Sequence, residues 1–210
     1  MPPTPVAEGR RATVTGLVLA GGQARRMGGL DKGLVPLAGR PMVEHVIEAL
    51  RPQVGKVLLS ANRNHERYAR YGCPVIADDV GGYPGPLAGV AAALRQCASE
   101  FMVAVPCDAP LLPPDLVVRL LAACEAGDAD SAVVHDGHRL QPVFMLLRSR
   151  VAPSLEAYLV GGGRRVDAWL SQLRTAVADF SDEAAAFVNV NDPDERQAVE
   201  AQLLSTRSAG

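Results

Sequence analysis

The chain has 210 residues, which is enough for one substantial domain with a buried core. Apolar residues make up 48% of it, and 21 basic side chains nearly balance 23 acidic ones, so the formal net charge is only −2. This balance gives no general reason to expect nucleic acid as a partner, and phosphate chemistry must depend on locally placed Lys and Arg. The sequence has no run of 18 apolar residues and no apolar N-terminal stretch, so we expect a cytoplasmic protein without a membrane span or signal peptide.

Over the first 125 residues, apolar runs bounded by turn residues alternate with helix-like segments. The apolar runs predict short buried strands at 13–19, 56–60, 74–77 and 101–106. The segments between them predict helices at 41–51, 64–71, 86–98 and 114–126. Pro41 and Pro114 fit first helical turns, and Gly127 fits a helix end. Alternation of this kind is typical of a parallel sheet that helices cover on both faces.

After residue 130 the pattern changes, because two predicted strands follow each other without a helix between them. The predicted elements there are strands at 131–134 and 139–147, helices at 151–160 and 165–173, a strand at 174–179 and a last helix at 193–204. This change predicts that the otherwise parallel sheet is mixed.

We therefore predict a single Rossmann-like α/β domain over residues 13–204, with a mostly parallel, mixed sheet and helices on both faces. Residues 1–12 and 205–210 are expected to be disordered tails. Within the domain, residues 13–125 are interpreted as a nucleotide-binding half and residues 126–204 as the half that binds an acceptor.

The most informative segment follows the first predicted strand and covers residues 19–34, LAGGQARRMGGLDKGL. Four glycines and three cations, Arg25, Arg26 and Lys32, lie within 12 of its residues. Glycines let backbone N–H groups approach a phosphate, and cations neutralise it. The segment matches neither G-x-x-x-x-G-K-[ST] nor G-x-G-x-x-G. A flexible surface loop would explain the glycines but not the cations, so we interpret the segment as a phosphate-binding loop.

A carboxylate ends another predicted strand, where residues 106–110 read PCDAP. The carboxyl ends of parallel strands face the crevice in which open α/β sheets bind ligands. A lone Asp at a strand end is often a helix cap or a turn former, but beside a phosphate loop we interpret Asp108 as a ligand of Mg²⁺. The adjacent Cys107 is either a nucleophile or a small buried residue, and we favour the second interpretation. None of the four cysteines has C-x-x-C spacing, so we expect no zinc site or disulfide framework.

A third segment, residues 78–89, reads DDVGGYPGPLAG, and its density of Pro and Gly predicts a shaped loop before a helix. Its first carboxylate, Asp78, is able to accept from the two adjacent donors of a guanine base. The alternative is a solvated turn without a ligand.

Two segments of the second half carry polar pairs for which a structural role competes with a functional one. In FVNVND, residues 187–192, alternation in a strand would send Asn189 and Asn191 to the same face, although asparagines at strand ends also make turns. In GGGRR, Arg164 and Arg165 either clamp an acceptor phosphate or cap a helix.

Taken together, these segments resemble the molybdenum cofactor guanylyltransferase family (MobA). The resemblance runs from about Val14 to Glu195; its most specific pattern is LAGG-x-x-RRMGG-x-DKGL, supported by YPGPLAG, PCD-x-P and QPVF. It implies a Rossmann-like fold and Mg²⁺-dependent transfer of GMP from GTP to the molybdopterin cofactor, giving the guanine dinucleotide form and pyrophosphate. GTP and molybdopterin cofactor are then the expected partners, with other cofactor-biosynthesis proteins and molybdoenzyme chaperones as further candidates, and residues 13–125 become the GTP-binding half.

The resemblance also implies site residues. Those that match the family's GTP site are Leu19, Ala20, Gly21, Gly22, Arg26, Gly29, Lys32, Asn62, Asp78, Gly85 and Asp108. Lys32, Arg26 and Asp108 are the predicted catalytic residues, and Asp108 matches the Mg²⁺ ligand. The acceptor-binding candidates are Arg164, Arg165, Asn189 and Asn191, of which the asparagines match a pair in the family. Where the family often reads N-x-N-T-P this chain has NVNDP, so Asp192 is either a second metal ligand or a helix N-cap.

The expected reaction is an in-line displacement, in which the terminal phosphate of molybdopterin attacks the α-phosphorus of GTP. It needs charge neutralisation by Lys32 and Arg26 but no general base, so none of the four histidines is assigned a role. Two alternatives stay open. One is a related nucleotidyltransferase that uses CTP with molybdopterin, or another triphosphate with a sugar phosphate. The other is a non-catalytic chaperone for nucleotide or cofactor, which would not need the metal ligand.

Overall fold

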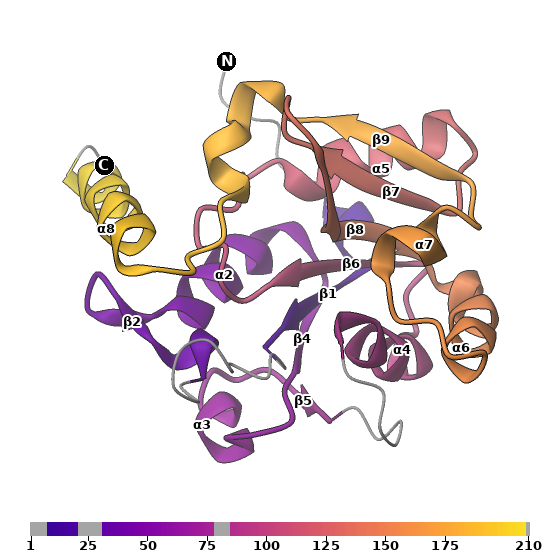
Figure 1. Ribbon diagram of the computed structural model, residues 1–210, viewed down its shortest axis with the longest axis horizontal. Helices are drawn as coiled ribbons and strands as arrows, with labels where there is room; N and C mark the ends of the chain where they lie inside the picture. The colour runs from indigo at the N-terminus through magenta and orange to yellow at the C-terminus, as the bar shows by residue number, and fades with distance from the viewer. Residues whose placement is uncertain (1–7, 21–30, 78–84, 209–210) are drawn as a thin grey trace.

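The computed structural model describes residues 8–20, 31–77 and 85–208. Seven strands form one sheet in the spatial order β5–β4–β1–β6–β8–β7–β9 (Figure 1). They are β1 (Val14–Leu19), β4 (Lys56–Ser60), β5 (Val75–Ile76), β6 (Phe101–Pro106), β7 (Ser131–His135), β8 (Leu140–Arg148) and β9 (Thr175–Asp179). In this sheet β8 pairs antiparallel with β6 and β7, while the other neighbouring strands are parallel. The sheet is therefore mixed and mostly parallel, and the prediction is confirmed.

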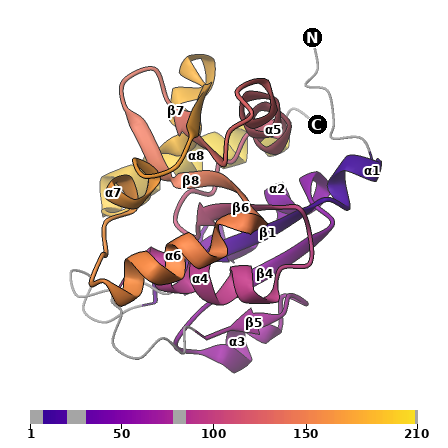
Figure 2. The same ribbon diagram turned by 90° about the vertical axis from the view of Figure 1, so that its right-hand side faces the viewer.

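Helices cover both faces of this sheet, as Figures 1 and 2 show. They are α2 (Met42–Leu50), α3 (His65–Ala69), α4 (Pro86–Gln96), α5 (Leu116–Ala126), α6 (Ala152–Val160) and α7 (Val166–Leu170). Helix α8 (Pro193–Ser208) lies beyond the sheet (Figure 1), where its Val199 belongs to a small cluster with Leu37 and Met42. Successive side chains of a strand point to opposite faces. In β6, Phe101 and Val103 join the core that includes α2 and α5, whereas Met102 and Ala104 join the core that includes α4, α6 and α7. One continuous sheet thus carries two apolar layers in a single α/β domain.

A small hairpin precedes α2 and was not predicted. Strands β2 (Pro36–Leu37) and β3 (Arg40–Pro41) pair around a two-residue turn. Ala38 and Gly39 both have positive φ values there, 48° and 79°, as a tight hairpin turn requires. Pro41 therefore ends a strand and occupies the N-cap position instead of the first helical turn.

The QPVF motif forms an irregular part of β8. Val133 pairs with Met145, but the next residue of β7 pairs with Gln141, so that residues 142–144 bulge out of the ladder. Proline lacks the N–H that a regular ladder position needs, and bulges are where strands tolerate it. The bulge brings the side chain of Gln141 to the buried Asp136, whose carboxylate accepts a hydrogen bond of 2.6 Å from it.

Two local predictions are wrong, those of the two tails, and one open alternative is decided against a strand. The chain is helical over α1 (Glu8–Arg11), inside the predicted N-terminal tail, and Arg10 forms an ion pair with Glu125. Helix α8 continues through the predicted tail to residue 208. Residues 188–192 form no strand, because the 3₁₀-helix η5 (Ser181–Phe187) leads into a segment that crosses the end of the sheet without joining it. Among the described residues, no helix combines the length and apolar character needed to cross a membrane.

Candidate active site

Neighbouring parallel strands end at the same edge of the sheet, and the candidate site lies there. The backbone N–H of Ala20, just after β1, donates to the carbonyl oxygen of Ser60 at 2.8 Å. The N–H of Cys107, just after β6, donates to the carbonyl oxygen of Leu19 at 3.1 Å. These bonds hold the ends of β4, β1 and β6 level, so Asp108 projects from the edge at which an open α/β sheet binds ligands.

The centre of the site is Lys32, the first residue of the 3₁₀-helix η2 (Lys32–Leu34). Its ammonium nitrogen Nζ donates to Oδ2 of Asp108 at 2.9 Å and to Oδ1 of Asn191. The Lys32 side chain is 26% exposed and that of Asp108 is 14% exposed. Partial burial strengthens such an ion pair and leaves both groups within reach of a ligand. The structure therefore brings together three predicted site residues that lie far apart in the sequence.

The segment that contains the two asparagines lies against Asp108. The N–H of Val190 donates to the backbone carbonyl of Asp108 at 2.8 Å. The Nδ2 of Asn191 donates to the carbonyl of Asn189 at 3.0 Å, so the two amides do not line one strand face as predicted. In the described part of the chain, Oδ1 of Asn189 is buried and has no hydrogen-bond partner. An unpaired buried acceptor is costly, so this oxygen is a position that a ligand would satisfy.

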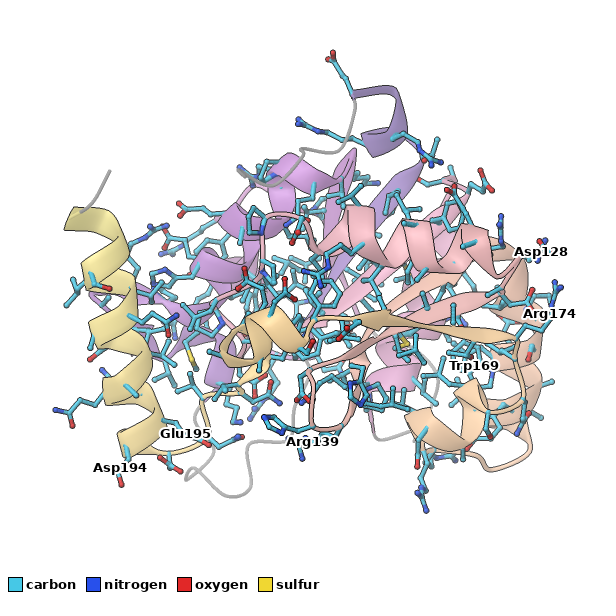
Figure 3. The ribbon with its side chains drawn as sticks, turned by 90° about the horizontal axis from the view of Figure 1, so that it is seen from above. Asp128, Arg139, Trp169, Arg174, Asp194 and Glu195 are labelled. Atoms are coloured by element: carbon cyan, nitrogen blue, oxygen red, sulfur yellow. The ribbon has the colours of Figure 1, made fainter. Side chains whose placement is uncertain are left out.

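Asp192 has a structural role at the start of α8. Its Oδ1 accepts from the N–H groups of Asp194 and Glu195, both at 2.9 Å, and Glu195 accepts in return from the N–H of Asp192. This reciprocal arrangement is an N-terminal capping box. Figure 3 labels Asp194 and Glu195 at this end of the helix. The geometry favours the cap over a second metal ligand.

Gly85 and the arginine segment form a second region of the site. Gly85 is the N-cap residue of α4 and has φ of 133°, a backbone conformation that favours glycine. A Cβ at Gly85 would lie 4.0 Å from the backbone oxygen of Arg164. The Arg164 guanidinium donates to the carbonyls of Leu159 and Gly163, and Arg165 forms an ion pair with Asp167. These bonds join the two arginines to residues of α6, of α7 and of the loop between these helices.

The second glycine of the YPGPLAG motif, Gly89, allows close packing of α4. A Cβ at Gly89 would lie 2.3 Å from Oγ of Ser60 and 3.3 Å from a side-chain carbon of Leu19. Only glycine therefore lets α4 approach the ends of β1 and β4 so closely. One contribution of this motif to the site is therefore to let α4 pack against the strand ends.

The remaining predicted residues divide into two groups. Asn62 is exposed just beyond the carboxyl end of β4. Five others lie outside the described residues, namely Gly21, Gly22, Arg26, Gly29 and Asp78. Their assignments remain predictions.

Cys107 does not have the properties of a nucleophile. It is 6% exposed, and burial raises the pKa of its thiol, as does the neighbouring charge of Asp108. The thiol is therefore protonated at neutral pH, and only a thiolate is an effective nucleophile. The interpretation of Cys107 as a small buried residue agrees with this geometry.

One carboxylate beside the site was not singled out from the sequence. Asp31 accepts hydrogen bonds from the hydroxyl of Tyr68 and from Nδ2 of Asn64. The signal available was its position directly before Lys32 in the DKGL motif. Its partners come from α3, and no local pattern connects them to it.

A metal ion bound at this site would need ligands from the nucleotide's phosphates as well as from the protein. Within the described ranges, no three His, Cys, Asp or Glu side chains are grouped to hold a cation. Asp108 and the unpaired oxygen of Asn189 are hard oxygen donors in adjoining segments. Mg²⁺ is commonly bound by one or two carboxylates together with substrate phosphates, so the donors present fit it.

Comparison with known proteins places the chain in a family. A family model described as a MobA-like NTP transferase domain matches residues 16–177. A molybdenum cofactor guanylyltransferase from Shewanella sp. (strain ANA-3) is 50% identical over 190 residues, which cover 90% of this chain and 96% of that protein. The protein of the same name from Shewanella pealeana is 51% identical over 186 residues, or 89% and 93% of the two chains.

Solved structures share the fold. Molybdopterin-guanine dinucleotide biosynthesis protein A from Archaeoglobus fulgidus has a TM-score of 0.77 at 24% identity, covering 91% of this chain and 99% of that one. The 2-C-methyl-D-erythritol 4-phosphate cytidylyltransferase from Thermus thermophilus has a TM-score of 0.67 at 15% identity, covering 89% and 97%. Since the family model spans most of the domain and the relatives match over nearly their whole length, this chain belongs to the MobA-like NTP transferase family.

Proposed function

We propose that this protein transfers GMP from GTP to the molybdenum–molybdopterin cofactor, forming the molybdopterin guanine dinucleotide cofactor and pyrophosphate. The names of relatives that match over about nine tenths of the chain support this function. The observation that carries it is the meeting of Lys32, Asp108 and Asn191 at the carboxyl edge of the sheet. A cation, a carboxylate and an amide gathered from three segments suit a site for phosphates.

Lys32 is suited to stabilise the leaving pyrophosphate. An ammonium has three N–H donors, and the recorded partners of Lys32 in the described residues, Asp108 and Asn191, use two of them. The third is available to a phosphate oxygen. A preorganised cation in a partly buried site stabilises developing negative charge more strongly than the same group in water.

The proposed site for Mg²⁺ is Asp108, with the unpaired oxygen of Asn189 as a further oxygen donor beside it. When bound, Mg²⁺ would neutralise phosphate charge. Asp108 would in that state have to serve both the cation and Lys32, and its two carboxylate oxygens allow this because Lys32 bonds to Oδ2.

A general base is not needed, because the attacking phosphate is already ionised at neutral pH. In-line phosphoryl transfer depends mainly on positioning and on charge neutralisation. The acceptor is proposed to bind through Asn189 and Asn191, which lie beside Asp108, with Arg164 and Arg165 further along the edge near Gly85. The nucleotide is proposed to contact Leu19, Ala20, Asn62 and Gly85, together with the loops outside the described residues.

We also propose that the enzyme works in the cytoplasm. All four cysteines are free thiols, and three of them are buried. Free thiols persist in the reducing cytoplasm.

The experiment that tests the function compares the four nucleoside triphosphates. Purified protein is incubated with each triphosphate, Mg²⁺ and molybdenum cofactor, and pyrophosphate release is measured. We expect turnover with GTP and a loss of it on addition of EDTA. Turnover with CTP alone would contradict guanylyl transfer and favour the cytidylyl alternative, whereas tight binding without turnover would indicate a chaperone.

A further inference from the structure

The side chains of Asp31, Asn64 and Tyr68 form a hydrogen-bonded group beside the turn that carries Lys32. None of the three has a role in the proposed reaction. Both oxygens of the Asp31 carboxylate accept hydrogen bonds, Oδ1 from the hydroxyl of Tyr68 and Oδ2 from Nδ2 of Asn64 at 2.9 Å. The donors come from residues 33 and 37 positions further along the chain. Asp31 is the N-cap residue of η2, and its carbonyl oxygen accepts from the N–H of Leu34 at 3.0 Å. The carboxylate therefore fixes the start of the turn from which Lys32 projects.

Tyr68 is a rigid donor for this bond. Its side chain has no exposed surface, and burial, followed by the hydrogen bond to Asp31, raises the pKa of its hydroxyl. The hydroxyl thus stays protonated and donates at any physiological pH. Asn64 is exposed and is the N-cap residue of α3, where its backbone adopts a left-handed conformation with φ of 55°. One donor therefore lies within α3 and the other at its N-cap.

The packing of Gly33 shows how tightly η2 rests on this group. A Cβ at Gly33 would lie 2.6 Å from Oη of Tyr68 and 3.4 Å from Sγ of Cys107. The side of Gly33 on which a Cβ would lie therefore faces both the tyrosine hydroxyl and the end of β6. Tyr68 thus contacts the turn directly as well as through Asp31, close to Cys107, the residue that precedes Asp108.

The Asp31 carboxylate and the Lys32 ammonium bond to different partners, although the two residues are adjacent in the chain. The Asp31 carboxylate bonds to two neutral donors of α3, whereas the ammonium of Lys32 pairs with Asp108. Among the described residues, no ion pair joins Lys32 to Asp31. Asp31 therefore anchors the backbone of the turn without neutralising the cation that it supports.

We propose that Tyr68 and Asn64, acting through Asp31, are positioning residues that hold the ammonium of Lys32 at the place of the triphosphate. This inference rests on the proposed function in one respect, since it requires Lys32 to contact the triphosphate. A displacement of about 1 Å in such a group can cost on the order of 100-fold in rate. The contribution of Tyr68 to catalysis thus depends on the presence of Lys32.

The test is a double-mutant cycle with Tyr68→Phe and Lys32→Ala, followed by kcat/KM for the substrate triphosphate and by calorimetric titration of that triphosphate without acceptor. We expect Tyr68→Phe to lower kcat/KM about tenfold or more and to weaken triphosphate binding. In the Lys32→Ala background the same substitution should change either quantity by less than about twofold, because residues that act as a unit are not additive. Tyr71→Phe is the matched control, because it removes a hydroxyl from a neighbouring tyrosine whose ring centroid lies 6.4 Å from that of Tyr68. This variant should leave kcat/KM within about twofold of the wild type.

If Tyr68→Phe does not fold, Asp31→Asn replaces it in the cycle, because the amide keeps the shape but turns one acceptor into a donor. An equal loss from Tyr68→Phe with and without Lys32 would mean that the tyrosine only stabilises the fold, and would overturn the positioning role while leaving the proposed function intact. Full activity and full triphosphate affinity of Lys32→Ala would remove Lys32 from the site and overturn both. Normal kcat/KM in Tyr68→Phe would overturn the positioning role alone.

Discussion

Two regions along the same edge of the sheet combine residues from both parts of the chain, but in different ways. At the first, side chains meet directly, because Lys32 bonds to Asp108 and to Asn191. At the second, contact is made through the backbone, because Gly85 lies beside the carbonyl of Arg164. The arginine side chains there form bonds with nearby residues of α6, of α7 and of the loop between them.

This difference indicates which region is better prepared to bind a charged ligand. The first region contains a partly buried cation, which a bound phosphate would pair with, and an unpaired buried amide oxygen, which a hydrogen-bond donor or a bound cation would satisfy. In the second region Arg165 is exposed and Arg164 is half-buried, and a ligand would have to draw both away from existing partners. Both regions combine residues from the two sides of the predicted boundary at residue 125.

The largest expected effect is on the first region. Lys32→Ala and Asp108→Ala should each lower kcat by roughly 10²–10³-fold, because each removes a preorganised charge from the phosphates. Steady-state pyrophosphate release checks the rate, and circular dichroism checks that the variants are folded. Activity within tenfold of the wild type in either folded variant would break the assignment of catalysis to this region.

The buried carboxylate of Asp136, away from both regions, is a useful contrast to Asp108. Both oxygens of Asp136 accept hydrogen bonds within the protein, whereas Asp108 is proposed to bind a ligand. Burial by itself raises the pKa of Asp136, but hydrogen bonds from Gln141, Arg139 and His138 outweigh it and lower the pKa from 3.8 to about 2. A depressed pKa stabilises the folded state above about pH 4, and this stabilisation is lost as the pH falls towards 2. The shift corresponds to roughly 2 kcal/mol.

We therefore expect Asp136→Ala to lower the free energy of unfolding by about 2 kcal/mol at neutral pH. Urea unfolding of both proteins between pH 2 and pH 7 measures this. The difference between wild type and variant should shrink as the pH approaches 2. A difference that stays constant over this range would show that the charge of Asp136 contributes nothing.

A smaller effect is expected from the asparagines. Asn189→Ala combined with Asn191→Ala should weaken molybdopterin binding about 30-fold, because each of the two lost hydrogen bonds costs about 1 kcal/mol. GTP affinity should stay within about twofold, as measured by separate calorimetric titrations. Val188→Ala, at an exposed neighbouring position, is the matched control. Equal losses for both ligands would mean that Asn191 acts mainly through Lys32.

The smallest effect is expected at the arginines of the second region. Arg165→Ala should raise KM for the acceptor by about threefold, because an exposed cation contributes little after screening by solvent. Asp167→Ala frees the guanidinium from its ion pair and should leave that KM unchanged or lower it. A rise in KM of similar size in both variants would show that the ion pair shapes the loop and that Arg165 does not contact the acceptor.

Much of the fold was predictable from local pattern. The apolar runs at residues 56–60 and 101–106 coincide with β4 and β6, because a strand buried on both faces must be apolar throughout. The turn at Ala38 was not predictable, since Ala seldom adopts a positive φ. The sequence left open whether Asn189 and Asn191 share a strand face or make a turn, because alternation in a short segment does not reveal whether a partner strand is available.

The candidate site divides in the same way. The sequence alone determined that Lys32 follows a glycine-rich loop and that Asp108 ends a buried strand, because both depend on residues adjacent in the chain. Only the tertiary structure decided that Asn191 bonds to Lys32, that Asp192 caps α8, and that Tyr68 supports the turn through Asp31. The physical reason is that the packing of whole helices and strands decides which side chains meet. The spacing of residues along the chain does not reveal such long-range hydrogen-bond partners.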